Sequence, residues 1–219
     1  MLKNIMNKNN IVLIVGATGA IGSAISEELK KEGFSDIIKL SRYTEPKIDL
    51  TNEKSICDAS FFIQKTGKEI ALLFDATGIL HLEKSNILPE KTYKNIDLSF
   101  MKKNFEINAY GPALLMKYFL PLLDTKNKSI FVTLSAKVGS IQDNRYGGWY
   151  SYRASKAALN QFIKTASIEM KIKNKHAICI SMHPGTVNSQ LSNPFQKNGL
   201  KVQSPKESAK NMLQVMLGV

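Results

Sequence analysis

The sequence predicts an α/β protein in which a doubly wound parallel sheet of six or seven strands lies between two helix layers, within one domain covering residues 1–219. Short apolar runs rich in β-branched residues, such as Ile11–Val15, are typical of strands buried on both faces. Segments with apolar residues at helical spacing alternate with these runs, a pattern that favours a parallel sheet. A glycine-containing turn, Gly16–Gly22, joins the first strand to the first helix.

Composition excludes several classes of protein. The chain has 219 residues and is 43% hydrophobic, as expected for a soluble globular domain. Its apolar runs are far shorter than the roughly 20 residues that a membrane helix needs, and the N-terminus lacks a signal-peptide pattern. Two cysteines, Cys57 and Cys179, indicate neither a disulfide framework nor a zinc site. We expect a reduced, cytoplasmic protein without a metal ion or membrane contact.

The net charge of +12 raises the question of nucleic-acid binding. The lysines are scattered, however, and no basic block is longer than Lys30-Lys31 or Lys102-Lys103. We therefore expect no nucleic-acid partner. A positive surface suits a phosphate-rich cofactor.

The first strand, turn and helix give the glycine motif the context that it needs to bind a dinucleotide. Gly16 permits a tight turn, Gly19 or Ala20 lets the backbone approach a pyrophosphate, and Gly22 lets the helix pack closely against the strand. The N–H groups at the start of the helix would then face the phosphates. The residues expected to contact the cofactor in this unit are Gly16, Thr18, Gly19, Ala20, Ile21 and Gly22. This is the arrangement of a Rossmann fold.

The second strand, near Asp36–Leu40, ends in Ser41 and Arg42. An acidic residue at this position binds the ribose of NAD(H), whereas an arginine nearby accommodates a 2′-phosphate. Ser41 and Arg42 therefore favour NADP(H) over NAD(H). The alternative is that Arg42 is only a solvated loop cation.

The next segments continue the alternation. A short third strand is expected from about Lys47 to Leu50, followed by a helix that Thr51 or Asn52 caps and that ends near Gly67. The strand Ile70–Phe74 then leads into Asp75–Gly78, at the edge where doubly wound sheets bind ligands. His81 lies in a polar connection and is expected to be an exposed loop residue.

A long helical pattern follows from about Leu98 to Leu123. Asn108, with Gly111 and Pro112 close behind it, breaks the local helix rules and predicts a bend. An asparagine at such a bend can present its side chain or a freed carbonyl to a site.

A buried strand at Ser129–Leu134 and a loop precede a helix expected at about Tyr150–Lys173. On this helix Tyr152 and Lys156 lie one turn apart on the same face. A cation beside a phenol lowers the phenol pKa, so the pair is suited to general acid–base chemistry. The alternative is an ordinary contact on an exposed helix face.

The remaining chain predicts a strand at Ala177–Met182 and a final helix beginning at Pro205. Residues 185–204 between them are polar and loop-like. A connection of this length is usually functional, so we expect a lid on the substrate side.

Taken together, these motifs resemble the short-chain dehydrogenase/reductase family, and most closely its small members of the carbonyl-reductase and C-factor type. The resemblance covers nearly the whole chain and rests on motifs in the right order, which are Gly16–Gly22, Asp75–Gly78, Asn108, Ser135, Tyr152-x-x-x-Lys156 and Pro184-Gly185. It implies reversible hydride transfer between NADP(H) and a small carbonyl or alcohol substrate. A catalytically weak NADP(H)-binding regulatory or signalling protein on the same fold is the alternative.

The resemblance also implies roles for single residues. Tyr152 would be the proton donor, Lys156 would lower its pKa and hold the nicotinamide ribose, and Asn108 would anchor a proton-relaying water. Further cofactor contacts are implied for Asp49, Leu50, Ala76, Thr77, Gly78, Pro184, Gly185, Thr186 and Val187. The helices carrying Asn108 and Tyr152 commonly form the dimer interface in this family, so we expect a homodimer or homotetramer.

Three positions depart from the family pattern. Ala20 occupies a common glycine position, with Gly19 one residue earlier. Ala136 stands where the catalytic serine is usual, and Ser135 or Ser140 could replace it, with Ser135 as our choice. The chain stops at Val219, soon after the last helix, where the family usually has a further strand.

Overall fold

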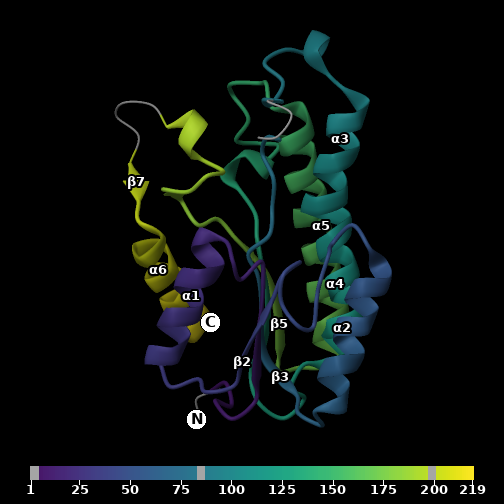
Figure 1. The fold of residues 1–219 in the computed structure, drawn as a ribbon, viewed down its shortest axis with the longest axis vertical. Helices are drawn as coiled ribbons and strands as arrows, with labels where there is room; N and C mark the ends of the chain where they lie inside the picture. Colours follow the sequence, from purple (N-terminus) through teal and green to yellow (C-terminus); the bar gives the residue numbers. More distant parts are fainter. Residues whose placement is uncertain (1–4, 83–86, 197–200) are drawn as a thin grey trace.

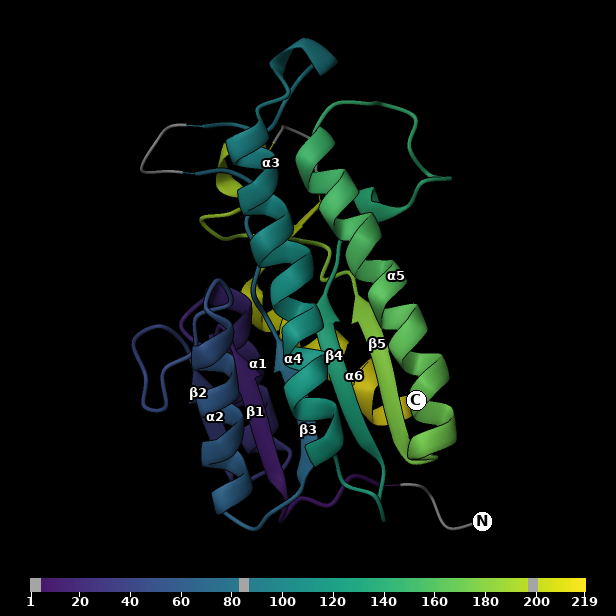
Figure 2. The ribbon, with the colours of Figure 1, turned by 90° about the vertical axis from the view of Figure 1, so that its right-hand side faces the viewer.

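A computed structural model of the chain describes residues 5–82, 87–196 and 201–219. Five parallel strands form the central sheet in the order β2-β1-β3-β4-β5, which is a doubly wound arrangement (Figures 1 and 2). The strands are β1 (Ile11–Val15), β2 (Ile37–Leu40), β3 (Ile70–Asp75), β4 (Ser129–Leu134) and β5 (Ala177–Met182). Because all five run in the same direction, their carboxyl ends meet at one edge, where such sheets bind ligands.

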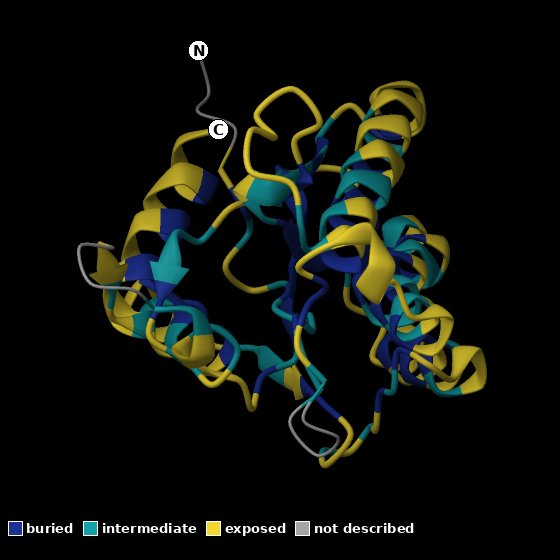
Figure 3. Cartoon of the chain, turned by 90° about the horizontal axis from the view of Figure 1, so that it is seen from above, coloured by how far each residue is buried: buried dark blue, intermediate teal, exposed yellow. Residues whose placement is uncertain are grey.

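Helices cover both faces of the sheet, which confirms the predicted three-layer architecture (Figure 1). On one face lie α1 (Ala20–Lys31) and α6 (Pro205–Gly218), and on the other α2 (Glu53–Lys65), α3 (Leu98–Phe105), α4 (Gly111–Phe119) and α5 (Tyr150–Lys173). Two buried apolar clusters, one on each side of the sheet, join these layers. Figure 3, seen from above, shows the buried segments gathered between the two helix layers.

The sheet has fewer strands than the six or seven predicted. The expected third strand near Lys47 is reduced to one isolated bridge with Ser41. Pro46 lacks an N–H group, so it could not extend the pairing. The described residues contain no strand after α6. The segment predicted as a lid, residues 185–204, is not purely loop: β6 (Thr186–Val187) and β7 (Val202–Gln203) form a small parallel ladder, and residues 197–200 lie outside the described residues.

The bend predicted at Asn108 is a π-helical turn, Glu106–Tyr110, inserted between α3 and α4. Pro112 has no N–H to bond the Asn108 carbonyl four residues earlier, so the regular helical pattern cannot continue there. Such π turns are frequent at functional sites. The irregularity therefore coincides with the residue singled out from the sequence.

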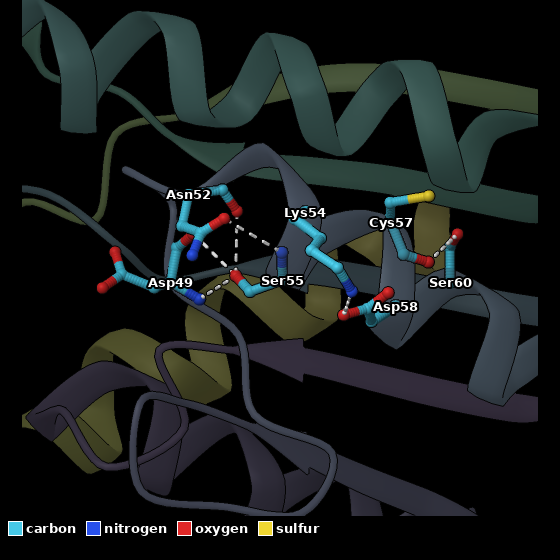
Figure 4. A network of polar contacts seen from close by, with 7 residues as sticks. All are labelled: Asp49, Asn52, Lys54, Ser55, Cys57, Asp58 and Ser60. Atoms are coloured by element: carbon cyan, nitrogen blue, oxygen red, sulfur yellow. Dashed lines mark hydrogen bonds and ion pairs between the residues drawn. The ribbon is translucent and has the colours of Figure 1, made fainter.

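Asn52 is the residue that caps α2, because its side chain accepts a hydrogen bond from Ser55 N. Figure 4 shows Ser55 tied to the backbone of Asp49 as well, with the Asp49 carboxylate pointing away from this network. The start of α2 thus fixes the backbone of Asp49 and leaves its carboxylate for other contacts. Among the described residues, no helix is long and apolar enough to cross a membrane.

Candidate active site

The turn after β1 is tightly packed and leads into a helix start that favours an anion. Gly16 has φ +76°, and a Cβ there would lie 3.1 Å from Thr77 Cγ2. A Cβ on Gly22 would lie only 2.4 Å from Gly16 O, so α1 could not pack against the turn with any larger residue. At the start of α1, Gly19 gives no side-chain cap and the first turn has no acidic residue. Its N–H groups and helix dipole thus favour a phosphate.

The end of β2 carries the predicted ribose-phosphate residues. Arg42 is exposed, whereas Ser41 is buried and its hydroxyl accepts a hydrogen bond from Tyr43 N. Burial acts to raise the pKa of Asp49, but hydrogen bonds from Thr51 and the charge of Arg42 outweigh it and hold the pKa below its ordinary value. Leu50 is buried and packs directly against Gly111 of α4. A Cβ added to Gly111 would lie only 2.7 Å from Leu50 Cβ.

The segment after β3 brings the two halves of the site together. Ala76 lies against Gly16 of the glycine turn, and its N–H donates to Val15 O. A Cβ on Gly78 would lie 3.4 Å from both Asn108 Oδ1 and Lys156 Nζ. Gly78 therefore lies at the junction between the turn that follows β3 and the polar groups of the helices.

Tyr152 and Lys156 are side by side on α5, as their spacing predicts. Both are buried, with exposed fractions of 7% and 3%. Lys156 Nζ lies 5.9 Å from the centroid of the Tyr152 ring and donates to Leu134 O at 2.7 Å. The interpretation as a surface contact on an exposed helix face is therefore wrong.

The pKa of the phenol differs from the sequence expectation. Burial raises the pKa of Tyr152 to about 12, because desolvation disfavours the charged phenolate. Burial also lowers the pKa of Lys156 to about 8, against the opposing charge of Asp75. In the protein alone, Tyr152 is thus a protonated phenol at neutral pH and Lys156 is close to its titration range.

Asp75 is a buried charge that the sequence reading assigned only to the cofactor turn. Its carboxylate accepts hydrogen bonds from Thr77 N, Thr77 Oγ1 and Thr133 Oγ1 at 3.0, 2.6 and 2.8 Å. Burial raises its pKa, while these hydrogen bonds and the charge of Lys156 act in the opposite direction. Asp75 therefore supplies the negative charge that opposes the desolvation of Lys156. Its position directly before the Ala76–Gly78 turn was the only signal for this role.

The Asn108 side chain holds the fold of the site. Its Oδ1 accepts from Ile79 N at 2.8 Å, and its Nδ2 donates to Ile79 O and to Ser155 Oγ at 2.9 and 3.1 Å. These bonds lock the turn after β3 to α5, three residues beyond Tyr152. The sequence left open whether Asn108 presents its side chain or its backbone carbonyl to the site. The side chain is already hydrogen-bonded to Ile79, so the backbone carbonyl, whose helical bond the π turn alters, is the group left for that role.

Ser135 and Ser140 line one cavity of about 360 Å³, together with Ala136, Lys137, Asp143, Asn160, Ser181 and His183. Ser135 is buried, and its hydroxyl donates to Asn160 Oδ1 at 2.7 Å. Ser140 is exposed, and its hydroxyl accepts from Asp143 N at 3.2 Å without using its own proton. Tyr152 is not among the residues that line this cavity. Asn160, which also accepts from Ser181 Oγ, had no signal in the sequence.

An aromatic cluster, formed by His81, Trp149 and Phe195, lies next to Tyr152. The Trp149 ring is 6.2 Å from the Tyr152 ring and 5.1 Å from the Phe195 ring, and His81 is 5.7 Å from Phe195, all edge to face. His81 is only partly exposed, and its Nε2 lies 3.3 Å from Gln190 O, so it is more enclosed than the predicted loop histidine. The cluster joins three segments that are distant in sequence, which explains why no pattern revealed it.

The segment after β5 turns back toward α6. Gly185 has φ +77°, and a Cβ there would lie 2.5 Å from Gln203 Nε2. Pro184 O accepts from Ser208 Oγ at 2.7 Å, while Thr186 and Val187 pair with β7. These contacts hold Pro184 to Thr186, which the resemblance implies lie against the nicotinamide, and Val187, a further expected cofactor contact.

Comparisons with known proteins agree with this architecture. The model of the short chain dehydrogenase family matches residues 10–199. A 1-hydroxy-2-glutathionyl-2-methyl-3-butene dehydrogenase from Rhodococcus is 28% identical over 194 residues, covering 84% of this chain and 80% of that protein. The C-signal protein of Myxococcus xanthus is 30% identical over 125 residues, covering 57% of this chain and 71% of that protein.

The fold is also that of solved structures. An NADPH-bound carbonyl reductase from chicken fatty liver superposes with a TM-score of 0.83 at 22% identity, covering 99% of this chain and 90% of that one. The family match covers most of the chain, and the Ala76–Gly78 segment lies against both Gly16 of the turn and Lys156 on α5. The chain therefore belongs to the short-chain dehydrogenase family of oxidoreductases.

Proposed function

We propose that this protein is an NADPH-dependent reductase of carbonyl compounds, with Tyr152 as the proton donor. The observation that carries the proposal is the buried Tyr152–Lys156 pair, 5.9 Å apart from ring centroid to Nζ, on the helix that faces the glycine turn across the Gly78 junction. Similarity to a dehydrogenase and to an NADPH-bound carbonyl reductase supports it.

The residues present fit NADP(H). Gly22 lets α1 pack closely against the Gly16 turn, and the uncapped start of α1 favours a pyrophosphate. Arg42 would hold the 2′-phosphate, with Ser41, Asp49 and Leu50 beside the adenosine. The other expected contacts are Thr18, Gly19, Ala20, Ile21, Ala76, Thr77, Gly78, Pro184, Gly185, Thr186 and Val187. When bound, the cofactor supplies the hydride.

Tyr152 would give its proton to the substrate oxygen. With a pKa raised to about 12 by burial, its phenol is protonated at neutral pH and so carries the proton that reduction requires. Lys156, charged below pH about 8, would stabilise the phenolate left behind and hold the ribose. The Asn108 carbonyl would anchor a water that returns a proton toward Lys156.

Because Ala136 occupies the usual position of the catalytic serine, a neighbouring serine hydroxyl would have to hold the substrate oxygen. We keep Ser135 as the candidate, which requires its hydroxyl to break the hydrogen bond to Asn160 Oδ1 and donate to the substrate oxygen instead. Ser140, in the same cavity, does not need to break such a bond. Either hydroxyl would act by aligning the carbonyl for proton transfer.

The aromatic cluster favours a carbonyl compound with an apolar or aromatic substituent. Trp149 and Phe195, whose rings are 5.1 Å apart, offer apolar ring surface next to Tyr152. Aromatic side chains favour stacking or edge-to-face contacts with a planar group. A panel of aromatic and aliphatic aldehydes and ketones should therefore consume NADPH, with higher kcat/KM for the aromatic members. No turnover of NADPH with any of them would contradict the proposed function.

Removal of the Arg42 side chain should change cofactor choice. We expect Arg42→Ala to weaken NADPH binding by about 1.5–3 kcal/mol, or roughly 10- to 150-fold, because a charge-assisted contact to the 2′-phosphate is lost. NADH lacks that phosphate and should bind with nearly unchanged affinity. Titration of both cofactors by fluorescence tests this, and equal weakening of the two would rule out the assigned contact.

The rate should fall as pH rises through about 8, because Lys156 then loses the charge that stabilises the phenolate. Asp75→Asn should move this alkaline limb to lower pH, since the Asp75 charge keeps the Lys156 pKa from falling further. Asn retains an acceptor oxygen for Thr77 or Thr133. A pH profile of kcat measures the shift, with Asp58→Asn on the exposed face of α2 as control. An unmoved limb in Asp75→Asn would refute the coupling.

A signalling protein that binds NADP(H) without turnover is the second candidate. Ala136 at the serine position and the similarity to the C-signal protein favour it. It predicts cofactor binding but no reduction of any carbonyl, and a cellular phenotype that survives Tyr152→Phe.

We also propose that the protein is a homodimer or homotetramer. An open cavity of about 440 Å³ on α3 and the π turn is lined by Leu98, Met101, Lys102, Phe105, Glu106 and Tyr110. Leu98 and Tyr110 are 64% and 53% exposed, which is unusual for large apolar side chains grouped on one helix face. Light scattering of the purified chain would decide it, and a monomer would contradict it.

A further inference from the structure

The helix that carries Tyr152 starts without a cap of its own. Its N-cap residue, Trp149, has the left-handed conformation, with φ 53° and ψ 42°, and makes no side-chain cap bond. The first turn of α5 also has no acidic residue. A helix start leaves N–H groups without partners and a partial positive charge, which a carboxylate can satisfy.

Glu90, from the connection between β3 and α3, supplies that carboxylate. Its side chain is buried with the residue only 3% exposed, and both carboxylate oxygens lie 3.2 Å from Ser151 N. Ser151 Oγ also donates to Glu90 Oε1. The backbone takes part as well, because Trp149 N donates to Glu90 O at 2.5 Å.

The turn before α5 is shaped to reach this residue. Gly148 has φ +64°, and a Cβ there would lie 3.3 Å from Glu90 O and 3.4 Å from Lys91 O. Gly148 O in turn accepts from Arg153 Nε at 3.1 Å. The backbone of residues 148–151 is therefore held on one side by Glu90 and on the other by the first turn of α5.

We propose that Glu90 is a positioning residue for the reductase reaction, and that it acts by fixing the first turn of α5 so that Trp149 and Tyr152 keep their places. This rests on the proposed function for its effect on rate. Ser151, which Glu90 binds, is fully buried and directly precedes Tyr152. Trp149 donates its backbone N–H to Glu90 O, and its ring centroid lies 6.2 Å from that of Tyr152. Displacement of either would move the phenol or the aromatic surface beside it.

The test compares Glu90→Ala and Glu90→Gln with Glu169→Ala. Glu169 is on the same helix, 59% exposed in a surface ion pair with Lys173, and controls for loss of a carboxylate on α5. The Glu90→Gln side chain keeps the volume of glutamate and one acceptor oxygen. This variant should therefore retain part of the activity, and it keeps the test possible if Glu90→Ala does not fold. Trp149 is the only tryptophan in the chain, so its fluorescence reports on this turn without any reaction.

In Glu90→Ala we expect a red-shifted Trp149 emission, faster hydrogen exchange in the first turn of α5, and a kcat about 10- to 100-fold lower, as for a small misplacement of a reacting group. The NADPH dissociation constant should stay unchanged, and Glu90→Gln should be intermediate in every readout. Glu169→Ala should match the wild type.

Two results would overturn the proposal. One is unchanged Trp149 fluorescence and hydrogen exchange in Glu90→Ala. The other is a clear change in both with an unaltered kcat, which would make Glu90 structural only. If the wild-type protein reduces no carbonyl, the proposed function fails, while the fluorescence and exchange still decide whether Glu90 fixes Trp149 and Ser151.

Discussion

Tyr152→Phe should lower kcat for carbonyl reduction by about 10²- to 10⁴-fold, the usual contribution of a positioned proton donor. The substitution removes only the hydroxyl and leaves the ring that contacts Trp149. Because the hydroxyl makes no hydrogen bond to the described residues, its removal should cost little or no free energy of unfolding. The measurement is the loss of NADPH absorbance with the best aromatic substrate from the panel.

Tyr150→Phe is the matched control. Tyr150 lies two residues earlier on α5, is 37% exposed, and has Ala154 rather than a lysine four residues later. We expect it to keep wild-type turnover, and both variants to bind NADPH normally. Full turnover in Tyr152→Phe would refute the mechanism, even if the protein still binds the cofactor.

Helices and strands of this chain could be predicted where the local sequence pattern itself determines the secondary structure. The apolar stripe of α5 places its ends at Tyr150 and Lys173, and buried β-branched runs mark β1, β3, β4 and β5 within a residue or two. Pro112 and Gly111 predicted the irregularity at Asn108 because a missing N–H acts locally. These features need no knowledge of what packs against them.

The site is less predictable because its chemistry depends on burial and on distant contacts. The Tyr152–Lys156 spacing predicts two adjacent side chains but not that both are buried or that Lys156 Nζ donates to Leu134 O. Burial raises the pKa of the phenol, whereas a neighbouring cation alone would lower it. Glu90 and Asp75 are single carboxylates without a motif, and their partners come from other elements. The partner of the Ser135 hydroxyl, Asn160 on α5, is also a contact between distant segments that no local pattern predicts.

Gly22→Ala should have the largest effect on the cofactor site. Its Cβ would lie 2.4 Å from Gly16 O, a backbone atom that cannot swing aside as a flexible side chain could. Relief requires α1 or the turn to shift. We expect the free energy of unfolding to fall by about 1–3 kcal/mol, as for overpacking elsewhere, and NADPH affinity to fall with it.

Gly19→Ala separates the two effects. Gly19 has φ −75°, which suits alanine, and its added Cβ would meet Gly16 O at 3.3 Å, a contact that a small shift can relieve. If Gly19 is where the backbone approaches the pyrophosphate, this variant should lose NADPH affinity while thermal unfolding stays near that of the wild type. If Ala20 is that position instead, Gly19→Ala should bind NADPH normally. Thermal unfolding and NADPH titration of both variants measure these effects. A Gly22→Ala protein with wild-type stability and affinity would refute the close packing of α1 on the turn, because its added methyl group would then meet no steric clash.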